Sequence, residues 1–152
     1  MNREIKFRAW DKINNEMIEW SKIFAYQMLY EILPNSMNEQ NIYKLMEYTG
    51  LKDINDKEIY EEDIVHYISH EHECIGVIKF GTYNQDGSDG EYDPEKCLGF
   101  YIDRIKMTPE EWDDEEFFND EYKYTKTNSI LYYDIENIEV IGDIYRNPEL
   151  LK

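Results

Sequence analysis

The stretch YKLMEYTGLKDINDKEIYEEDIVHYISHEHECIGVIKF, at residues 43–80, is the most regular part of the chain and decides its fold. Its short runs of apolar and β-branched residues, at 43–51, 58–60, 63–68 and 74–80, are separated by polar turns. No long helical pattern lies between them. Short strands joined by tight turns are typical of an antiparallel meander or a small barrel. This stretch therefore predicts a mainly β protein.

The N-terminal segment predicts a β-hairpin. Residues 5–10, IKFRAW, alternate with the period of a strand. A polar turn at 11–16 and an apolar segment at 17–20 complete the pair. Because Trp10 lies on the face opposite Phe7, we expect this first strand to be covered on both faces.

Two short helices are expected outside the strands. Apolar residues at helical spacing in 23–33, IFAYQMLYEIL, favour a helix that ends at Pro34, with a continuing strand as the alternative because the run is rich in β-formers. Thr108 can cap free amide groups and Pro109 suits the first helical position. We therefore expect a second helix at 109–119.

The remaining segments complete a small, strongly bent antiparallel barrel or meander, mainly β with a minor α+β character. A loop is expected from residue 84 to 96, and strands at 98–105, 129–134 and 137–145. Asn147 and Pro148 have the pattern of a cap before a terminal helical turn. The 152 residues suit a single domain at 1–152, with an acidic insert-like segment at about 84–128.

Charge and cysteine content restrict the class of protein. With 34 acidic and 16 basic side chains, the formal charge is −18. Direct binding of nucleic acid or of anionic membranes is therefore disfavoured, whereas a basic protein is a possible partner. Two cysteines make no disulfide scaffold, and we see neither a signal sequence nor a membrane span. We expect a cytoplasmic protein.

The acidity is concentrated in one segment. Residues 86–121 contain 14 acidic and three basic side chains. Such an array can imitate the phosphate track of DNA and occupy a host nucleic-acid-binding protein, although a solvated surface or an ordinary protein contact explains it equally. The candidate partner-binding residues are Trp112, Asp113, Asp114, Glu115 and Glu116.

All three histidines lie close to a cysteine: the cluster is His66, His70, His72 and Cys74. In an extended strand the last three would project from one face. Histidine and cysteine are good zinc ligands, so zinc is a possible cofactor, and a pH-sensing role is another hypothesis. Three ligands on one straight strand cannot converge on one ion without a bend. The structural alternative is a buried Cys74 with histidines on an exposed hairpin.

Enzyme signatures are absent from the sequence: it has no phosphate-binding glycine loop, no nucleophile elbow and no HExxH pattern. A nucleophilic Cys74 beside His72 is conceivable, but no third group orients the pair. We therefore expect no catalytic residues, no cofactor other than the zinc hypothesis, and no enzyme activity.

Three blocks resemble the YopX family of phage and prophage proteins. They are REIKFRAWDK at 3–12, LMEYTGLKDINDKEIYEEDIV at 45–65 and IEVIGDIYRNPELL at 138–151. The family usually carries glycine where this chain has Glu62, and often where it has Asp56. The resemblance implies a mainly β, barrel-like core and assembly into homo-oligomers. It transfers no activity.

The sequence thus favours a phage or prophage accessory protein in a host bacterial cell, non-catalytic, that binds other proteins or itself. A DNA-mimicking inhibitor of a host protein and a metal-binding protein are the two alternatives.

Overall fold

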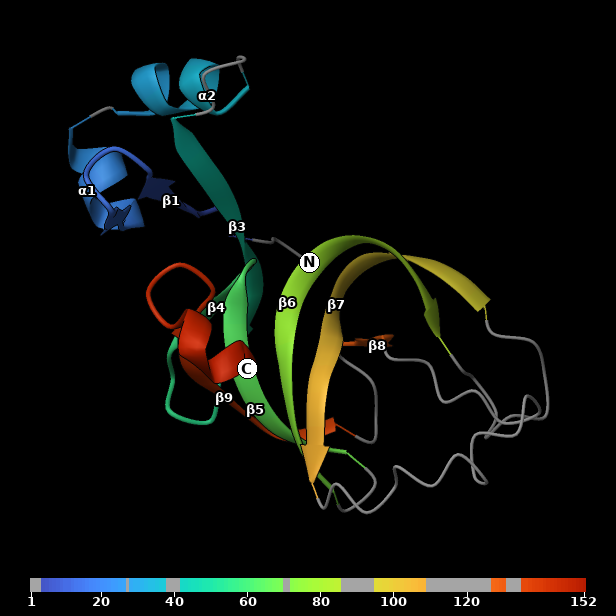
Figure 1. The fold of residues 1–152 in the computed structure, drawn as a ribbon. Helices are drawn as coiled ribbons and strands as arrows, with labels where there is room; N and C mark the ends of the chain where they lie inside the picture. The colour runs from blue at the N-terminus through green and yellow to red at the C-terminus, as the bar shows by residue number, and fades with distance from the viewer. Residues whose placement is uncertain are drawn as a thin grey trace. The chain divides into compact units, whose positions relative to one another are not determined.

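The structure is a computed structural model, and it describes residues 4–26, 28–37, 42–69, 72–85, 95–108, 127–130 and 135–152. The chain divides into two compact units. The first comprises Met1–Lys52 and Glu58–Glu61, and the second comprises Asp53–Lys57 and Glu62–Lys152 (Figure 1). The predicted mainly β class is confirmed. The strands of the 43–80 meander are, however, shared between two sheets, and the single domain stays a prediction.

The first unit contains a four-stranded antiparallel sheet and two helices. Its elements are β1 (Phe7–Asp11), β2 (Glu16–Ile18), α1 (Trp20–Ala25), α2 (Leu29–Met37), β3 (Tyr43–Lys52) and β4 (Glu58–Tyr60). The strand order is β2-β1-β3-β4. The predicted N-terminal hairpin is confirmed, since Ala9 lies opposite Ile18 of β2 and Leu45 of β3.

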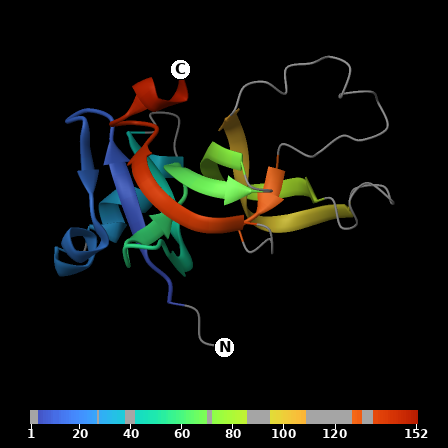
Figure 2. The same ribbon diagram turned by 90° about the horizontal axis from the view of Figure 1, so that it is seen from below.

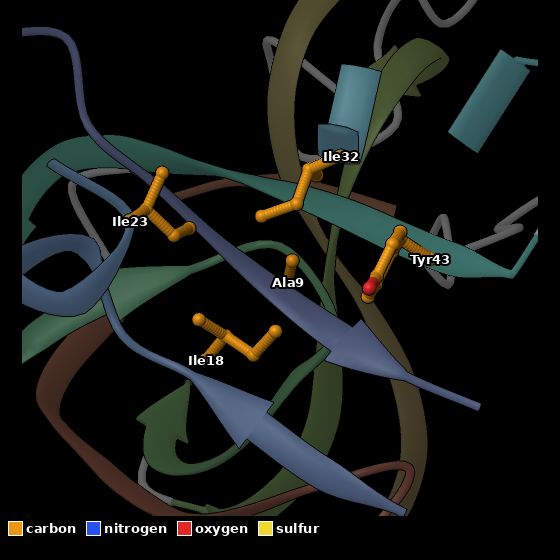
Figure 3. Packing of buried hydrophobic residues seen from close by; sticks show 5 residues of the cluster. All are labelled: Ala9, Ile18, Ile23, Ile32 and Tyr43. Carbon is orange, nitrogen blue, oxygen red and sulfur yellow. The ribbon is translucent and has the colours of Figure 1, made fainter. Parts of the chain in front are cut away.

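The core of the first unit forms where both helices meet the sheet. Its buried residues are Ala9, Ile18, Ile23, Ile32 and Tyr43 (Figure 3). Burying an isoleucine side chain stabilises a fold by about 1.5–3 kcal/mol, so the three isoleucines are its main anchors. The opposite face of β1 is also covered, because Arg8 and Trp10 are buried. Arg8 lies 4.9 Å from the ring centre of Tyr60.

The prediction of one helix ending at Pro34 was wrong. The chain forms two helices, and Pro34 lies inside the second. A proline in a helix removes one backbone N–H donor and disfavours the turn. Side chains supply extra hydrogen bonds there: Asn35 Nδ2 donates to Glu31 O at 2.8 Å, and Ser36 Oγ donates to Leu33 O at 2.9 Å. These bonds stabilise the last turn beyond Pro34.

The second unit contains a five-stranded antiparallel sheet. Its elements are β5 (Asp63–Ser69), β6 (His72–Gln85), β7 (Glu95–Thr108), β8 (Thr127–Ser129), β9 (Ile135–Asp143) and the terminal 3-10 helix η2 (Pro148–Leu151). The strand order is β8-β7-β6-β5-β9. Figures 1 and 2 show that β6 and β7 bend strongly along their length, so the sheet curls.

Several predicted strand limits were too narrow or displaced. The limits expected for the loop at 84–96 were wrong at both ends, because β6 continues to Gln85 and β7 begins at Glu95; residues 86–94 lie outside the described residues. Of the strand expected at 129–134, Ser129 belongs to β8 (Thr127–Ser129) and Ile130 is in a turn, whereas residues 131–134 lie outside the described residues. The strand expected at 137–145 is present as β9. Asn147 precedes η2 as expected but makes no side-chain cap bond.

A glycine allows β6 and β7 to pack closely where β7 bulges. Gly76 pairs with Arg104 and Ile75 pairs with Lys106, so Ile105 is an extra residue on β7. A Cβ atom on Gly76 would lie 2.4 Å from Ile102 Cγ2. Only glycine fits this crossing without displacing its neighbour.

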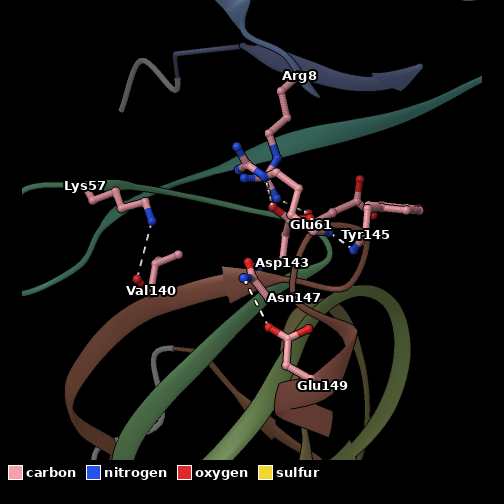
Figure 4. A network of polar contacts seen from close by, with 9 residues as sticks. Arg8, Lys57, Glu61, Val140, Asp143, Tyr145, Asn147 and Glu149 are labelled. Atoms are coloured by element: carbon pink, nitrogen blue, oxygen red, sulfur yellow. Dashed lines mark hydrogen bonds and ion pairs between the residues drawn. The ribbon is translucent and has the colours of Figure 1, made fainter. Parts of the chain in front are cut away.

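A carboxylate fastens residues 53–57 to the outer edge of β9. Asp53 Oδ1 accepts hydrogen bonds from the backbone N–H groups of Asn55 and Lys57, at 2.8 and 2.9 Å. Its Oδ2 accepts one from the Val140 N–H at 3.0 Å. Lys57 Nζ donates to Val140 O at 3.3 Å (Figure 4). Burial by itself would raise the pKa of Asp53, but the three N–H donors outweigh it and lower the pKa.

A second buried carboxylate organises the turn after β9. Asp143 Oδ1 accepts from the N–H groups of Tyr145 and Arg146, at 3.0 and 2.9 Å. Its Oδ2 accepts from Arg146 Nε at 2.6 Å. Burial opposes ionisation of Asp143, but these hydrogen bonds and the Arg146 charge outweigh it and lower its pKa. Both carboxylates are therefore structural anchors.

Two turn residues adopt left-handed backbone conformations that favour glycine. Asp56 has φ 64° and Glu62 has φ 63°. These are the positions at which the resembling family usually (Glu62) or often (Asp56) carries glycine. The backbone thus keeps the glycine conformation although the side chains differ. Aspartate tolerates this region better than glutamate does, so the strain is greater at Glu62.

Candidate protein-interaction surface

The predicted histidine–cysteine cluster lies on the β5–β6 hairpin, but its members do not share one face. Tyr67 lies opposite Cys74, and His66 lies opposite Ile75. Residues paired across antiparallel strands share a face, and successive residues alternate. His66 is therefore on the face opposite that of His72 and Cys74. Its Nε2 is instead 3.9 Å from Glu73 Oε2.

The zinc hypothesis depends on a residue that the structure does not describe, because His70 lies outside the described residues. Within the part of the chain that is described, no three His, Cys, Asp or Glu side chains gather so that they could hold a metal ion. Zinc binding stays a prediction that an elemental analysis must test.

Cys74 has the surroundings of a structural thiol. It is buried, and its Sγ–H donates to His72 O at 3.7 Å. Burial raises its pKa, and the nearby Arg104 and Tyr67 offset only part of this effect. A raised pKa keeps the thiol protonated at neutral pH, whereas a nucleophile must be a thiolate. The hypothesis of a nucleophilic Cys74 gains no support from this environment.

The predicted acidic partner site also lies beyond what the structure describes. Trp112, Asp113, Asp114, Glu115 and Glu116 all fall outside the described residues, and so does the helix expected at 109–119. The DNA-mimic hypothesis is therefore untested.

The β6–β7 ribbon presents an apolar face that passes from the core to the surface. Ile78 pairs with Ile102, Phe80 with Phe100, and Thr82 with Leu98, so all six side chains share one face. Both isoleucines are fully buried. Farther along the ribbon the side chains of this face become accessible to solvent: Phe80 is 50% exposed and Leu98 is 72% exposed.

The aromatic side chains at the surface of the ribbon, exposed or half-buried, contact one another in pairs. The rings of Phe80 and Phe100 meet edge to face, with 5.0 Å between their centres. On the other face, Tyr83 and Tyr101 stack at 5.1 Å, on either side of the Gly81–Gly99 pair. Hydrogen-bonded strands with packed aromatic pairs form a preordered surface, which lowers the entropic cost of binding.

The ribbon is also unusually free of carboxylates for so acidic a chain. No Asp or Glu occurs from residue 74 to 85, nor from 96 to 102. Within these two stretches the charged residues are Lys79 and Lys96, and Lys79 Nζ lies 2.8 Å from Asp103 Oδ2. Protein interfaces are depleted of charge at their centre. The ribbon has the composition of such a centre.

The helices of the first unit carry a second group of exposed apolar side chains. Its members are Phe24, Tyr26, Tyr30, Leu33 and Met37. They are spread over two short helices, one of which contains a proline. The ribbon is the better candidate, because its apolar residues form one continuous face on paired strands.

Sequence reasoning placed the partner site in the acidic segment, which stays a prediction, and did not single out the ribbon as a second candidate. A signal was present: twelve residues without Asp or Glu, in a chain with 34 of them, with apolar residues at alternate positions. Which of these residues remain exposed could not be read from the pattern.

The fold is that of a small, mainly β protein whose β6–β7 ribbon carries a candidate contact surface. The chain belongs to the YopX family, since the family model described as "YopX protein" matches residues 6–152. Among solved structures it is similar to protein EF1440 from Enterococcus faecalis, at 23% sequence identity and a TM-score of 0.50. That match covers 99% of this chain and 100% of the other. At this identity the likeness shows the fold alone.

A comparison with curated proteins finds no match. Among the described residues, no helix is long and apolar enough to cross a membrane.

Proposed function

We propose that this YopX-family protein is a non-catalytic phage or prophage accessory protein that acts by binding protein, in the first place other copies of itself, in the host cytoplasm. The contact surface is the apolar face of the β6–β7 ribbon. The observation that carries the proposal is the row formed by exposed Phe80, exposed Leu98 and half-buried Phe100 on a carboxylate-free stretch of paired strands.

Charge favours this surface over the rest of the chain. Copies that each carry a formal charge of −18 repel one another at long range. The repulsion is weakest where carboxylates are missing, and apolar burial there contributes about 25 cal/mol per Å². Self-association through the ribbon should therefore strengthen as salt screens the remaining charges.

The test is the mass of the particle in solution, measured by light scattering after size exclusion over a range of protein and salt concentrations. We expect a mass that is a multiple of 18.5 kDa. Leu98→Asp places a charge on the most exposed apolar side chain of this face. It should weaken association at least about tenfold, because an unpaired charge would be buried in the contact.

A matched control uses an apolar residue of similar exposure. Ile13, in the turn after β1, is 69% exposed, compared with 72% for Leu98. Ile13→Asp should leave the particle mass unchanged. A wild-type protein of 18.5 kDa at every concentration, or equal effects of the two substitutions, would contradict self-association through the ribbon.

A further inference from the structure

Strand β9 forms one edge of the second sheet. Its inner side pairs with β5, and no other strand among the described residues pairs with it. The strand is nine residues long, and four of these are isoleucine or valine. The outward N–H and C=O groups of such a long apolar edge are a template on which another chain can add a strand. This edge therefore needs a cover if the protein is not to associate through it.

The segment Asp53–Lys57, called the edge cover below, binds the outer side of β9. The Ile54 N–H donates to Ile138 O at 3.0 Å. Two residues farther along β9, the Val140 N–H donates to Asp53 Oδ2 at 3.0 Å, and Val140 O accepts from Lys57 Nζ at 3.3 Å (Figure 4). Because two of these three bonds come from side chains, the edge cover is not itself an added strand. It occupies the backbone groups that an added strand would use.

The edge cover also offers no N–H group on which the sheet could continue, because all five of its backbone N–H groups already have acceptors. That of Ile54 binds β9, and the other four bind inside the cover. These four are the N–H of Asp53 to Lys57 O at 2.8 Å, the N–H of Asp56 to Asp53 O at 3.1 Å, and the N–H groups of Asn55 and Lys57 to Asp53 Oδ1 at 2.8 and 2.9 Å. A strand extends a sheet by exchanging N–H···O bonds with the next strand. The sheet therefore ends at the cover.

We propose that the edge cover closes β9 against strand addition by a second copy of this chain. Every copy carries the same edge, so two uncovered copies can pair β9 with β9 about a two-fold axis, the commonest symmetry of homo-oligomers. The cover blocks this contact and leaves the β6–β7 ribbon as the contact surface between copies. That last step rests on the proposed self-association, whereas the closure of β9 does not.

The first test is hydrogen exchange of backbone amides in the full-length protein, followed by NMR. The test variant combines Asp53→Asn with Lys57→Met. The asparagine oxygen should take the place of Oδ1, which accepts two bonds, so that its NH₂ group faces the Val140 N–H. The Val140 amide should then exchange at least about tenfold faster than in the wild type, because it has lost its acceptor.

The amide of Glu139 is the internal reference for this exchange. Glu139 pairs with His66, and alternation along β9 turns its N–H toward β5. It should stay protected in the variant, which shows that β9 remains in the sheet. Equal Val140 exchange rates in wild type and variant overturn the cover.

The second test is the particle mass by light scattering in a Leu98→Asp background, so that the ribbon does not contribute. With the cover intact this protein should have a mass of 18.5 kDa at every concentration. With Asp53→Asn and Lys57→Met added it should associate, and the Val140 amide should become slow again in the associated form. Asp143→Asn in the same background is the control. It removes another buried carboxylate but leaves the cover in place, so it should not associate.

The outcomes separate the two proposals. A mass of 18.5 kDa at every concentration in the uncovered protein overturns strand addition, and equal association of the Asp143→Asn control overturns the role of the cover. Association of Leu98→Asp alone contradicts self-association through the ribbon, and the exchange rate of Val140 still decides the closure of β9. If the double substitution does not fold, Asp53→Asn alone carries both tests, with the same expected results.

Discussion

A substitution of Asp53 tests most directly how the second unit is held together. It joins residues 53–57 to β9 through three backbone N–H groups, from Asn55, Lys57 and Val140. Asp53→Asn keeps the size of the side chain but removes its charge. It also replaces one acceptor oxygen with an NH₂ donor, so that one N–H group loses its acceptor.

The expected loss in the free energy of unfolding can be estimated from these hydrogen bonds. A buried N–H left without a partner costs about 1–3 kcal/mol, and the remaining bonds lose their charge assistance. We expect Asp53→Asn to lower the free energy of unfolding by about 2–4 kcal/mol at pH 7. For a chain of this length the melting temperature should fall by about 4–16 °C. Urea unfolding followed by circular dichroism measures the difference.

The effect should depend on pH in a defined direction. Because the pKa of Asp53 is lowered in the folded protein, its stabilisation is present above the unfolded value of about 3.9. It is lost as the pH falls through the folded value. The gap between wild type and Asp53→Asn should therefore be constant above about pH 5 and shrink below it.

The matched control is Asp56→Asn, in the same segment. Asp56 is exposed and asparagine tolerates its positive φ, so this change should stay within about 0.5 kcal/mol. Equal losses in the two variants, or a gap that does not change between pH 7 and pH 3, would refute the assignment of Asp53 as an ionised anchor.

Three further changes test the packing and the turns. Gly76→Ala should lower the free energy of unfolding, measured by urea denaturation, by about 1–3 kcal/mol, because its Cβ would lie 2.4 Å from Ile102 Cγ2. Gly99→Ala is the control, because a Cβ there would meet open space. Glu62→Gly should be more stable than Glu62→Ala in thermal melts, by about 1 kcal/mol, since only glycine relieves the left-handed strain. Asp143→Asn should destabilise by about 2–4 kcal/mol at neutral pH, and this difference should shrink in acid because the folded pKa is lowered.

Local patterns in the sequence were sufficient to predict two hairpins, although not the limits of the later strands. The apolar alternation of 63–80 gave the β5–β6 hairpin, and the pattern of 5–20 gave the β1–β2 hairpin. The helix was wrongly predicted to end at Pro34, because helix propensity takes no account of the hydrogen bonds that the Asn35 and Ser36 side chains donate to backbone carbonyls. The division into two sheets could not be predicted, since it depends on pairings between segments far apart in the chain.

The candidate surface could be predicted only in part. Ile78 and Phe80 have the same place in the alternating pattern, yet one is buried and the other half exposed. Whether other parts of the folded protein bury a given side chain cannot be predicted from the local pattern of apolar residues.

Cross-linking between isotopically distinct copies tests the central claim most directly. Equal amounts of ¹⁴N- and ¹⁵N-labelled protein are mixed, treated with an amine-reactive cross-linker and analysed by mass spectrometry. Self-association through the ribbon predicts mixed-isotope peptides that join Lys79 or Lys96 of one copy to Lys79 or Lys96 of another, and their loss in Leu98→Asp. Mixed-isotope links that involve neither lysine, or that persist in Leu98→Asp, would show that copies meet elsewhere and would contradict the account.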